Sequence, residues 1–205
     1  MIIWIASYPK SGNTWVRSFL TAYYFCKKGV FDINKLNLIE DYPNKQFFED
    51  TVKQGEIHKH WESSQKNIYE KKEAKFLKTH NSLITAFGND FAIPKYTLGA
   101  IYIIRDPRNV ITSVKNHNDL ESYDEALEFM QDENKVLEDY PHLKNYAKTN
   151  IVNSWRINYQ SWIKSRSFPK LIIRYEDMIN KPLETFKKLV VFVNSLCLLY
   201  TSPSP

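Results

Sequence analysis

Four short apolar segments, each followed directly by polar or charged side chains, constrain the fold more than any other feature of this sequence. They are residues 2–6, 75–77, 98–104 and 171–173. Long stretches of helical character separate them, and this spacing favours strand–helix–strand units. Strands buried within a parallel sheet are apolar along nearly their whole length, as these segments are apart from Lys75. The sequence therefore predicts an α/β fold, with a central parallel sheet flanked by helices on both faces.

The polar side chains that follow the four segments indicate where a ligand would bind. They occupy residues 8–10, 78–80, 105–106 and 174–177. In open α/β sheets, ligands bind outside the carboxyl ends of the strands. We therefore expect the four polar clusters to converge on one site.

Composition narrows the class of protein. The 205 residues, 43% hydrophobic and 25% charged, suit a single globular domain. The net charge of +5 fits an anionic ligand, but the basic residues are scattered, so nucleic acid is not an expected partner.

Two cysteines, Cys26 and Cys197, argue against a disulfide framework. No apolar run reaches the roughly 18 residues of a membrane span, and MIIWIASYPK lacks the positive start of a signal peptide. We expect a cytoplasmic protein without a membrane span, and the oligomeric state stays open.

The last ten residues, LCLLYTSPSP, differ from the rest of the chain. An amphipathic helix is expected from near Pro182, and the apolar run and Ser/Pro end that follow it show no pattern of core positions. We predict one domain over residues 1–195 and a non-native tail over residues 196–205, similar to translated adapter sequence. The natural chain would then continue differently near Ser195. The alternative is a genuine disordered tail.

The string IIWIASYPKSGNTWVRSFLTAYY indicates a strand, a turn and a helix, with Pro9 and Gly12 in the turn. The helix is expected over residues 14–27, closed by Gly29. Three side chains are candidate caps of this helix: Ser11, Asn13 and Thr14. Backbone N–H groups at a helix N-terminus, together with the ammonium group of Lys10, predict a P-loop-like anion site. The simpler alternative is a capped helix after a buried strand.

Within this string, YPKSGNTW resembles the 5'-phosphosulfate loop of sulfotransferases that use 3'-phosphoadenosine 5'-phosphosulfate (PAPS). It lacks the G-x-x-x-x-G-K-[ST] pattern of P-loop phosphotransferases. A transferring sulfuryl group carries less negative charge than a phosphoryl group, so lysines and amides suffice. The resemblance implies PAPS as sulfuryl donor, PAP as product and no required metal. It assigns donor contacts to six residues: Lys10, Ser11, Gly12, Asn13, Thr14 and Trp15.

Lys78 and His80 end the second apolar segment, in FLKTH. Residues i and i+2 of a strand face the same way, so the ammonium and imidazole groups are expected to point together into the site. The resemblance assigns His80 as general base and Lys78, with Lys10, to charge stabilisation during transfer. A histidine suits this task because its pKa lies near neutrality. The alternative is a structural or surface histidine. Four further histidines are expected to be solvated: His58, His60, His117 and His142.

The string IYIIRDPRNVITSV resembles the 3'-phosphate motif of the same family, which assigns Arg105 and Ser113 to that phosphate. Arginine offers a planar fork of donors and serine a neutral hydroxyl donor. Pro107 is expected at the start of a helix. Asp106 is expected in an ion pair with its neighbouring arginines and not at a metal.

The string LIIRYEDM also matches the family, which assigns Tyr175, with Trp15, to the adenine ring. Glu176 and Asp177 are expected to cap the turn that follows. Upstream, Trp155 and Trp162 stand seven residues apart on one helical face and are expected to pack in the core.

The resemblance spans residues 2–194 and implies in-line transfer of a sulfuryl group to a hydroxyl or amine. The family's C-terminal basic, glycine-containing loop has no counterpart here, which places the activity of this chain in question. Two alternatives are a P-loop nucleotide kinase or phosphotransferase and an inactive PAP-binding module. Residues 31–74 and 117–150 are expected to select a small-molecule or carbohydrate acceptor, with aromatic residues such as Phe47, Phe48 and Trp61. Sugars, phenols, aliphatic alcohols and amines all remain candidates.

Overall fold

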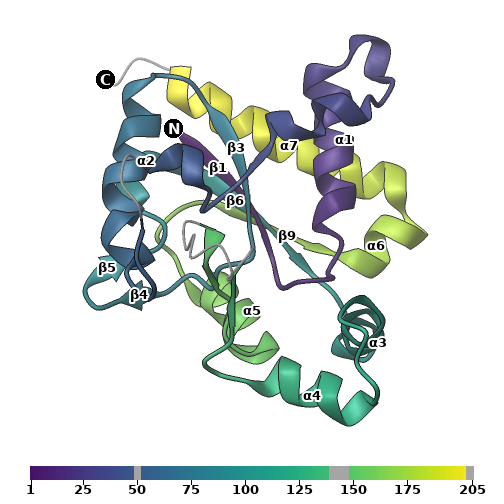
Figure 1. Ribbon diagram of the computed structural model, residues 1–205. Helices are drawn as coiled ribbons and strands as arrows, with labels where there is room; N and C mark the ends of the chain where they lie inside the picture. Colours follow the sequence, from purple (N-terminus) through teal and green to yellow (C-terminus); the bar gives the residue numbers. More distant parts are fainter. Residues whose placement is uncertain (49–51, 139–147, 202–205) are drawn as a thin grey trace.

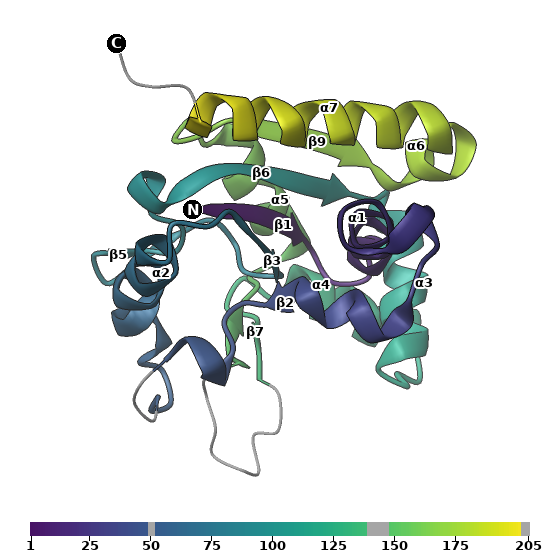
Figure 2. The same cartoon turned by 90° about the horizontal axis from the view of Figure 1, so that it is seen from above.

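The computed structural model describes residues 1–48, 52–138 and 148–201 (Figure 1). Its centre is a five-stranded sheet in the order β2-β3-β1-β6-β9, in which every neighbouring pair is parallel. The strands are β1 (Ile2–Ser7), β2 (Glu40–Asp41), β3 (Lys75–Thr79), β6 (Thr97–Ile104) and β9 (Lys170–Arg174). Figure 2 shows β1, β6 and β9 with their carboxyl ends on the same side of the molecule. The predicted fold class is confirmed.

The four predicted apolar segments are four of the five strands. The fifth, β2, is a two-residue edge strand made of Glu40 and Asp41, paired only to β3. Two charged residues carry no apolar pattern, so this strand could not be predicted from the sequence.

The helices and short ladders complete the described chain. The α-helices are α1 (Asn13–Phe25), α2 (Trp61–Glu70), α3 (Pro107–His117), α4 (Tyr123–Gln131), α5 (Trp155–Lys164), α6 (Tyr175–Asn180) and α7 (Pro182–Thr201). Short 3₁₀ turns lie at η1 (Lys27–Gly29), η2 (Ile33–Leu38), η3 (Lys45–Phe47), η4 (Ile57–His60) and η5 (Pro94–Tyr96). Two small antiparallel ladders pair β4 (Thr85–Ala86) with β5 (Asn89–Asp90), and β7 (Val136–Leu137) with β8 (Asn150–Ile151).

The first helix is shorter at its end than predicted. It stops at Phe25 because Cys26 adopts an extended backbone (φ −107°, ψ 145°), and Gly29 closes the short turn η1 instead. Pro107 opens α3, as expected.

The sheet is apolar on both faces because the strand side chains alternate. On β1, Trp4 packs into a cluster with Trp61 of α2 and Trp162 of α5. Its neighbour Ile5 points the other way, into a cluster that includes Leu20 of α1 and residues of α7. Helices therefore cover both faces, with α2 and α5 on one and α1 and α7 on the other (Figure 1).

Two aromatic expectations have different outcomes. Trp162 is fully buried, as predicted, whereas Trp155 is half-buried and joins a separate cluster with α3 and α4. Phe47 and Phe48, predicted near an acceptor, pack against the same core cluster that contains the buried Trp61. These three aromatic side chains therefore support the fold and do not line the site cavity described below.

The last helix, α7, packs against the sheet beyond the predicted domain boundary. Leu196 is 2% exposed and belongs to the same apolar cluster as Leu189 and Val193. A Cβ placed on Gly99 of β6 would lie 2.8 Å from the Leu196 Cδ1 atom, so the helix approaches the strand closely there. Residues 202–205 lie outside the described residues, and the division at residue 195 stays a prediction. Among the described residues, no helix combines the length and apolar character needed to cross a membrane.

Leu196→Ala should lower the free energy of unfolding by about 2–5 kcal/mol, because it leaves a cavity beside Gly99. Urea unfolding followed by circular dichroism measures this change. Val191→Ala is the matched control: Val191 is on the same helix but 68% exposed, so its loss should change stability by less than about 0.5 kcal/mol. A Leu196→Ala protein as stable as the control would show that the helix end does not contribute to the fold.

Candidate functional site

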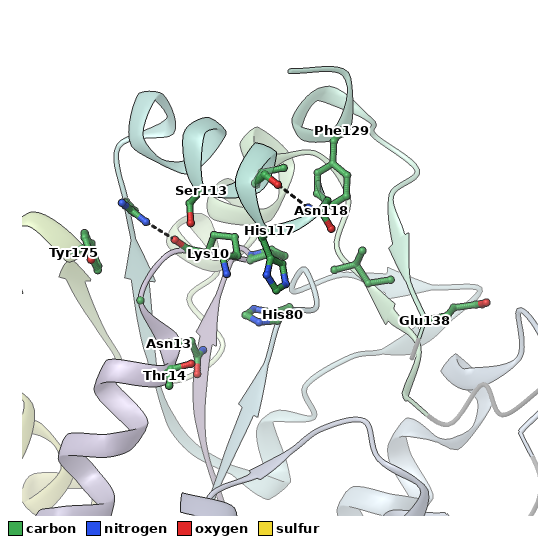
Figure 3. Close-up of a pocket in the computed structure, with 15 residues that line it drawn as sticks. Lys10, Asn13, Thr14, His80, Ser113, His117, Asn118, Phe129, Glu138 and Tyr175 are labelled. Atoms are coloured by element: carbon green, nitrogen blue, oxygen red, sulfur yellow. Dashed lines mark hydrogen bonds between the residues drawn. The ribbon is translucent and has the colours of Figure 1, made fainter. Parts of the chain in front are cut away.

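A cavity of about 590 Å³ opens at the carboxyl ends of the central strands. Its volume lies in the range of small-molecule sites. Eight of the predicted site residues line it: Lys10, Gly12, Asn13, Thr14, His80, Arg105, Ser113 and Tyr175. In Figure 3, Tyr175 lies at one side of the cavity and Phe129 and Glu138 at the other, with Lys10 and His80 between them. The expected convergence of the strand ends is confirmed.

The loop between β1 and α1 has an unusual backbone. Lys10 and Gly12 both adopt left-handed conformations, with φ angles of 65° and 97°. Such changes of hand turn backbone N–H groups towards a common point and form anion-binding concavities. For lysine the conformation costs about 1–2 kcal/mol, and strain of this kind concentrates at functional sites. At Gly12 a side chain is also excluded sterically, because a Cβ would lie 2.4 Å from Cδ2 of Tyr175.

The predicted side-chain caps of α1 are wrong. The N-cap is Gly12, and no side chain caps the helix. Asn13 already lies within the first turn, and its Nδ2 donates to the Ile5 carbonyl at 3.0 Å and to Ser7 Oγ at 3.2 Å. Ser11 is buried without a hydrogen-bond partner for its hydroxyl. The N-terminal N–H groups of α1 are therefore not engaged by capping side chains.

Arg105 contacts both the loop after β1 and α6. Its Nη1 donates to the backbone carbonyl of Lys10 at 2.8 Å, and its guanidinium carbon lies 4.3 Å from the ring centre of Tyr175. Its Nε is buried without a partner. The expectation that Lys10 and Arg105 lie at the same edge of the sheet is confirmed.

The carboxylates near Arg105 have structural roles. Asp106 forms the expected ion pair with Arg108, at 2.5 Å, and its Oδ1 also accepts the Arg108 N–H to cap α3. The predicted capping by Glu176 and Asp177 is wrong, because α6 begins without a side-chain cap. Glu176 Oε1 instead accepts the backbone N–H of Asp106 at 2.9 Å. Both acidic residues lie within the first turn of α6, too late to act as its N-cap.

His80 is held in one orientation at the centre of the cavity. Its Nδ1 lies 2.8 Å from the Ser7 carbonyl oxygen, which can only accept, so Nδ1 carries the proton and Nε2 is an acceptor. Burial lowers the pKa of His80 well below its usual value, and the positive charge of Lys78 adds to this effect. The imidazole is therefore neutral at pH 7.

Lys78 does not point into the cavity with His80, contrary to the prediction. Its ammonium nitrogen lies 3.3 Å from Asp41 Oδ1, and it does not line the cavity. The reason is the unpredicted strand β2, which places Asp41 directly opposite Lys78 in the sheet.

Two other predicted contact residues lie outside the cavity lining: Ser11 and Trp15. Trp15 is 38% exposed and packs edge-on against Tyr175, with ring centres 6.2 Å apart.

Several cavity residues were not predicted individually. They come from the segment 117–150 and are His117, Asn118, Phe129, Leu137 and Glu138. His117 is exposed, as expected, but it lines the cavity. None of these residues stands in a motif, so only their place in the predicted covering segment indicated them.

The remaining histidine expectations differ in outcome. His58 is buried and its ring lies 5.0 Å from that of Phe87, so the prediction of a solvated side chain is wrong. His60 is half-buried, and residue 142 lies outside the described residues. Within the described part of the chain, no group of three or more metal-ligating side chains comes together.

Comparisons with known proteins agree with this architecture. The family model of the sulfotransferase domain matches residues 2–196, and the chain belongs to this family. The solved structure of retinol dehydratase in complex with androsterone and the inactive cofactor PAP matches with a TM-score of 0.55 at 16% identity, covering 94% of this chain and 59% of that chain. A sulfotransferase domain from the curacin biosynthetic pathway matches with a TM-score of 0.39 at 18% identity, covering 94% of this chain and 73% of that one. This chain thus spans less than two thirds of the length of retinol dehydratase. No curated protein sequence matches it.

The low pKa of His80 predicts a specific pH dependence of stability. Because the unfolded chain protonates this histidine near pH 6.5 and the folded protein only at lower pH, stability falls as pH drops below about 6.5. His80→Asn should reduce this fall, since the asparagine amide can keep the hydrogen bond to Ser7 but does not titrate. Urea midpoints at pH 7.5 and pH 5 measure the difference. Equal falls in both proteins would contradict the burial of a neutral imidazole.

Proposed function

We propose that this protein is a PAPS-dependent sulfotransferase that transfers a sulfuryl group to a hydroxyl or amine of a small-molecule or carbohydrate acceptor. The observation that carries the proposal is one cavity that contains the Lys10 loop, His80 and the Arg105–Ser113 pair. Membership of the sulfotransferase domain family supports the class of reaction. The PAP complex of retinol dehydratase supports the identity of the donor.

The residues present fit a donor with two separate anionic groups. Lys10 and the left-handed turn at the start of α1 would hold the 5'-phosphosulfate. Arg105 and Ser113, on β6 and α3, would hold the 3'-phosphate, and the buried Arg105 Nε still has a donor to offer. One face of the Tyr175 ring is occupied by Arg105, so a contact with adenine would use the other face or the edge of the ring. When bound, PAPS supplies the sulfuryl group.

His80 is the proposed general base. Its neutral imidazole presents an unprotonated Nε2, which can accept the proton that the acceptor hydroxyl loses. Lys10 would stabilise the negative charge that grows on the leaving-group side. Lys78 pairs with Asp41 and does not line the cavity, so its effect on transfer would be indirect.

The acceptor would bind on the side of His80 away from Tyr175. Phe129 and Glu138 lie on this side (Figure 3), and Leu137, the residue before Glu138, also lines the cavity. This side combines an apolar surface with a carboxylate, and it lies within the segment predicted to select the acceptor.

Arg105→Ala should weaken the binding of PAP about tenfold more than that of adenosine 5'-phosphosulfate, which lacks the 3'-phosphate. The reason is the loss of a charge-assisted contact that only PAP makes. Isothermal titration calorimetry with both ligands measures the two affinities. Equal losses for both would show that Arg105 does not bind the 3'-phosphate.

His80→Asn should leave the affinity for PAP nearly unchanged while lowering kcat by about 10²–10⁴-fold, because the amide keeps the Ser7 contact but accepts no proton. Transfer from radiolabelled PAPS to a panel of acceptors measures kcat. The loss should be smaller for acidic phenols, which ionise near neutral pH without a base. Lys10→Met should show no such dependence, since its task lies on the leaving-group side.

The same assay separates an enzyme from an inactive PAP-binding module, which would bind PAP without turnover. Equal losses of kcat for acidic and non-acidic acceptors in His80→Asn would contradict the general-base role.

A further inference from the structure

The guanidinium group of Arg105 has protein partners that a residue devoted to the 3'-phosphate would not need. Its Nη1 donates to the Lys10 carbonyl at 2.8 Å, and its plane lies over the Tyr175 ring at 4.3 Å. The hydrogen bond reaches across 95 positions of sequence, from the end of β6 to the loop after β1. Arg105 is therefore tied to the phosphosulfate loop as well as to the proposed 3'-phosphate site.

Arg105 contacts the loop at Lys10, the residue with the strained backbone. Lys10 has a φ angle of 65°, and a non-glycine residue keeps such a conformation only where its surroundings determine it. Arg105 holds the carbonyl of this same residue. The contact therefore favours the left-handed backbone on which the direction of the neighbouring loop N–H groups depends.

Residues in the first turn of α6 restrict the position of the Arg105 side chain. Tyr175 packs so closely on the loop that a Cβ at Gly12 would lie 2.4 Å from its Cδ2. Its ring also supports the Arg105 guanidinium, a cation–π contact that restricts the side chain. The next residue, Glu176, accepts the N–H of Asp106 at 2.9 Å and so joins α6 to the residue after Arg105.

We propose that Tyr175 and Glu176 are positioning residues, and that Arg105 acts through the Lys10 carbonyl to hold the phosphosulfate loop in its binding conformation. The two ends of the donor site are then coupled through one guanidinium group. This inference rests on the proposed function for its ligands. It extends that function, because Arg105 becomes important for ligands that have no 3'-phosphate.

The first test measures the affinity for adenosine 5'-phosphosulfate by calorimetry. Arg105→Met should weaken this ligand about tenfold, since a charge-assisted hydrogen bond to the loop is lost. Ser113→Ala is the matched control: Ser113 lines the same proposed 3'-phosphate end from α3, whereas the hydrogen bond to the Lys10 carbonyl comes from Arg105. It should weaken PAP while leaving adenosine 5'-phosphosulfate within about twofold of the wild type. Unchanged affinity in Arg105→Met would overturn the proposal.

Tyr175 is tested in the same assay. Tyr175→Leu should weaken adenosine 5'-phosphosulfate about threefold to tenfold, and Tyr175→Phe should lose less affinity because it keeps the ring beneath the guanidinium. In the Tyr175→Leu background, Arg105→Met should have a smaller further effect than in the wild type. Full and independent losses would show that the ring does not position Arg105.

A ligand-free measurement keeps the inference separate from the proposed function. Melting temperatures of wild type, Arg105→Met, Tyr175→Leu and the double variant form a cycle, and residues in contact give non-additive effects. The double variant should lose less than the sum of the single losses. Additive losses of melting temperature would show that Arg105 and Tyr175 are not coupled, whichever ligand the protein binds. A wild-type protein that binds neither adenine ligand would instead disprove the donor specificity, while the cycle still decides whether the contact exists.

Discussion

The structure depends on the complete burial of β1. All six residues of this strand are buried, with β3 on one side, β6 on the other and helices over both faces. Its carboxyl end therefore has a fixed position, and so does the loop that follows it. Because the strands on both sides are parallel to β1, their carboxyl ends bring His80 and Arg105 to that same loop. A single parallel arrangement thus places the loop after β1, the histidine and the arginine together.

Within the site, positive charges surround a neutral imidazole. Arg105 and Lys10 face the cavity, and Lys78 lies close enough to lower the pKa of His80. The Ser7 carbonyl opposes this effect, and it also fixes the tautomer. A donor ligand with several negative charges would reduce the electrostatic penalty on a protonated His80. Binding of such a ligand would therefore raise the pKa of His80 and strengthen it for its proposed role as general base.

Strong local patterns made much of this architecture predictable. Strands buried over all or most of their length, such as β1 and β6, read as continuous apolar runs, and Pro107 marked the start of α3. The contacts that were mispredicted involve partners distant in sequence. Lys78 is turned to Asp41 by a strand with no apolar residues, and Glu176 finds the N–H of Asp106 across 70 positions. Capping rules likewise failed at α1, because Asn13 forms a tertiary contact with the end of β1 instead of a local one.

The sequence by itself determined the parallel α/β fold, the anion loop and the identity of the polar residues at the strand ends. These properties follow from hydrophobic periodicity and from short motifs. Both are local patterns, so they can be recognised without knowing which segments lie next to each other in the fold. Only the tertiary structure decided which side chains face the cavity, which tautomer His80 adopts and how Arg105 joins the loop to Tyr175. Those features depend on distances between segments far apart in the chain, and packing of the whole sheet fixes these distances.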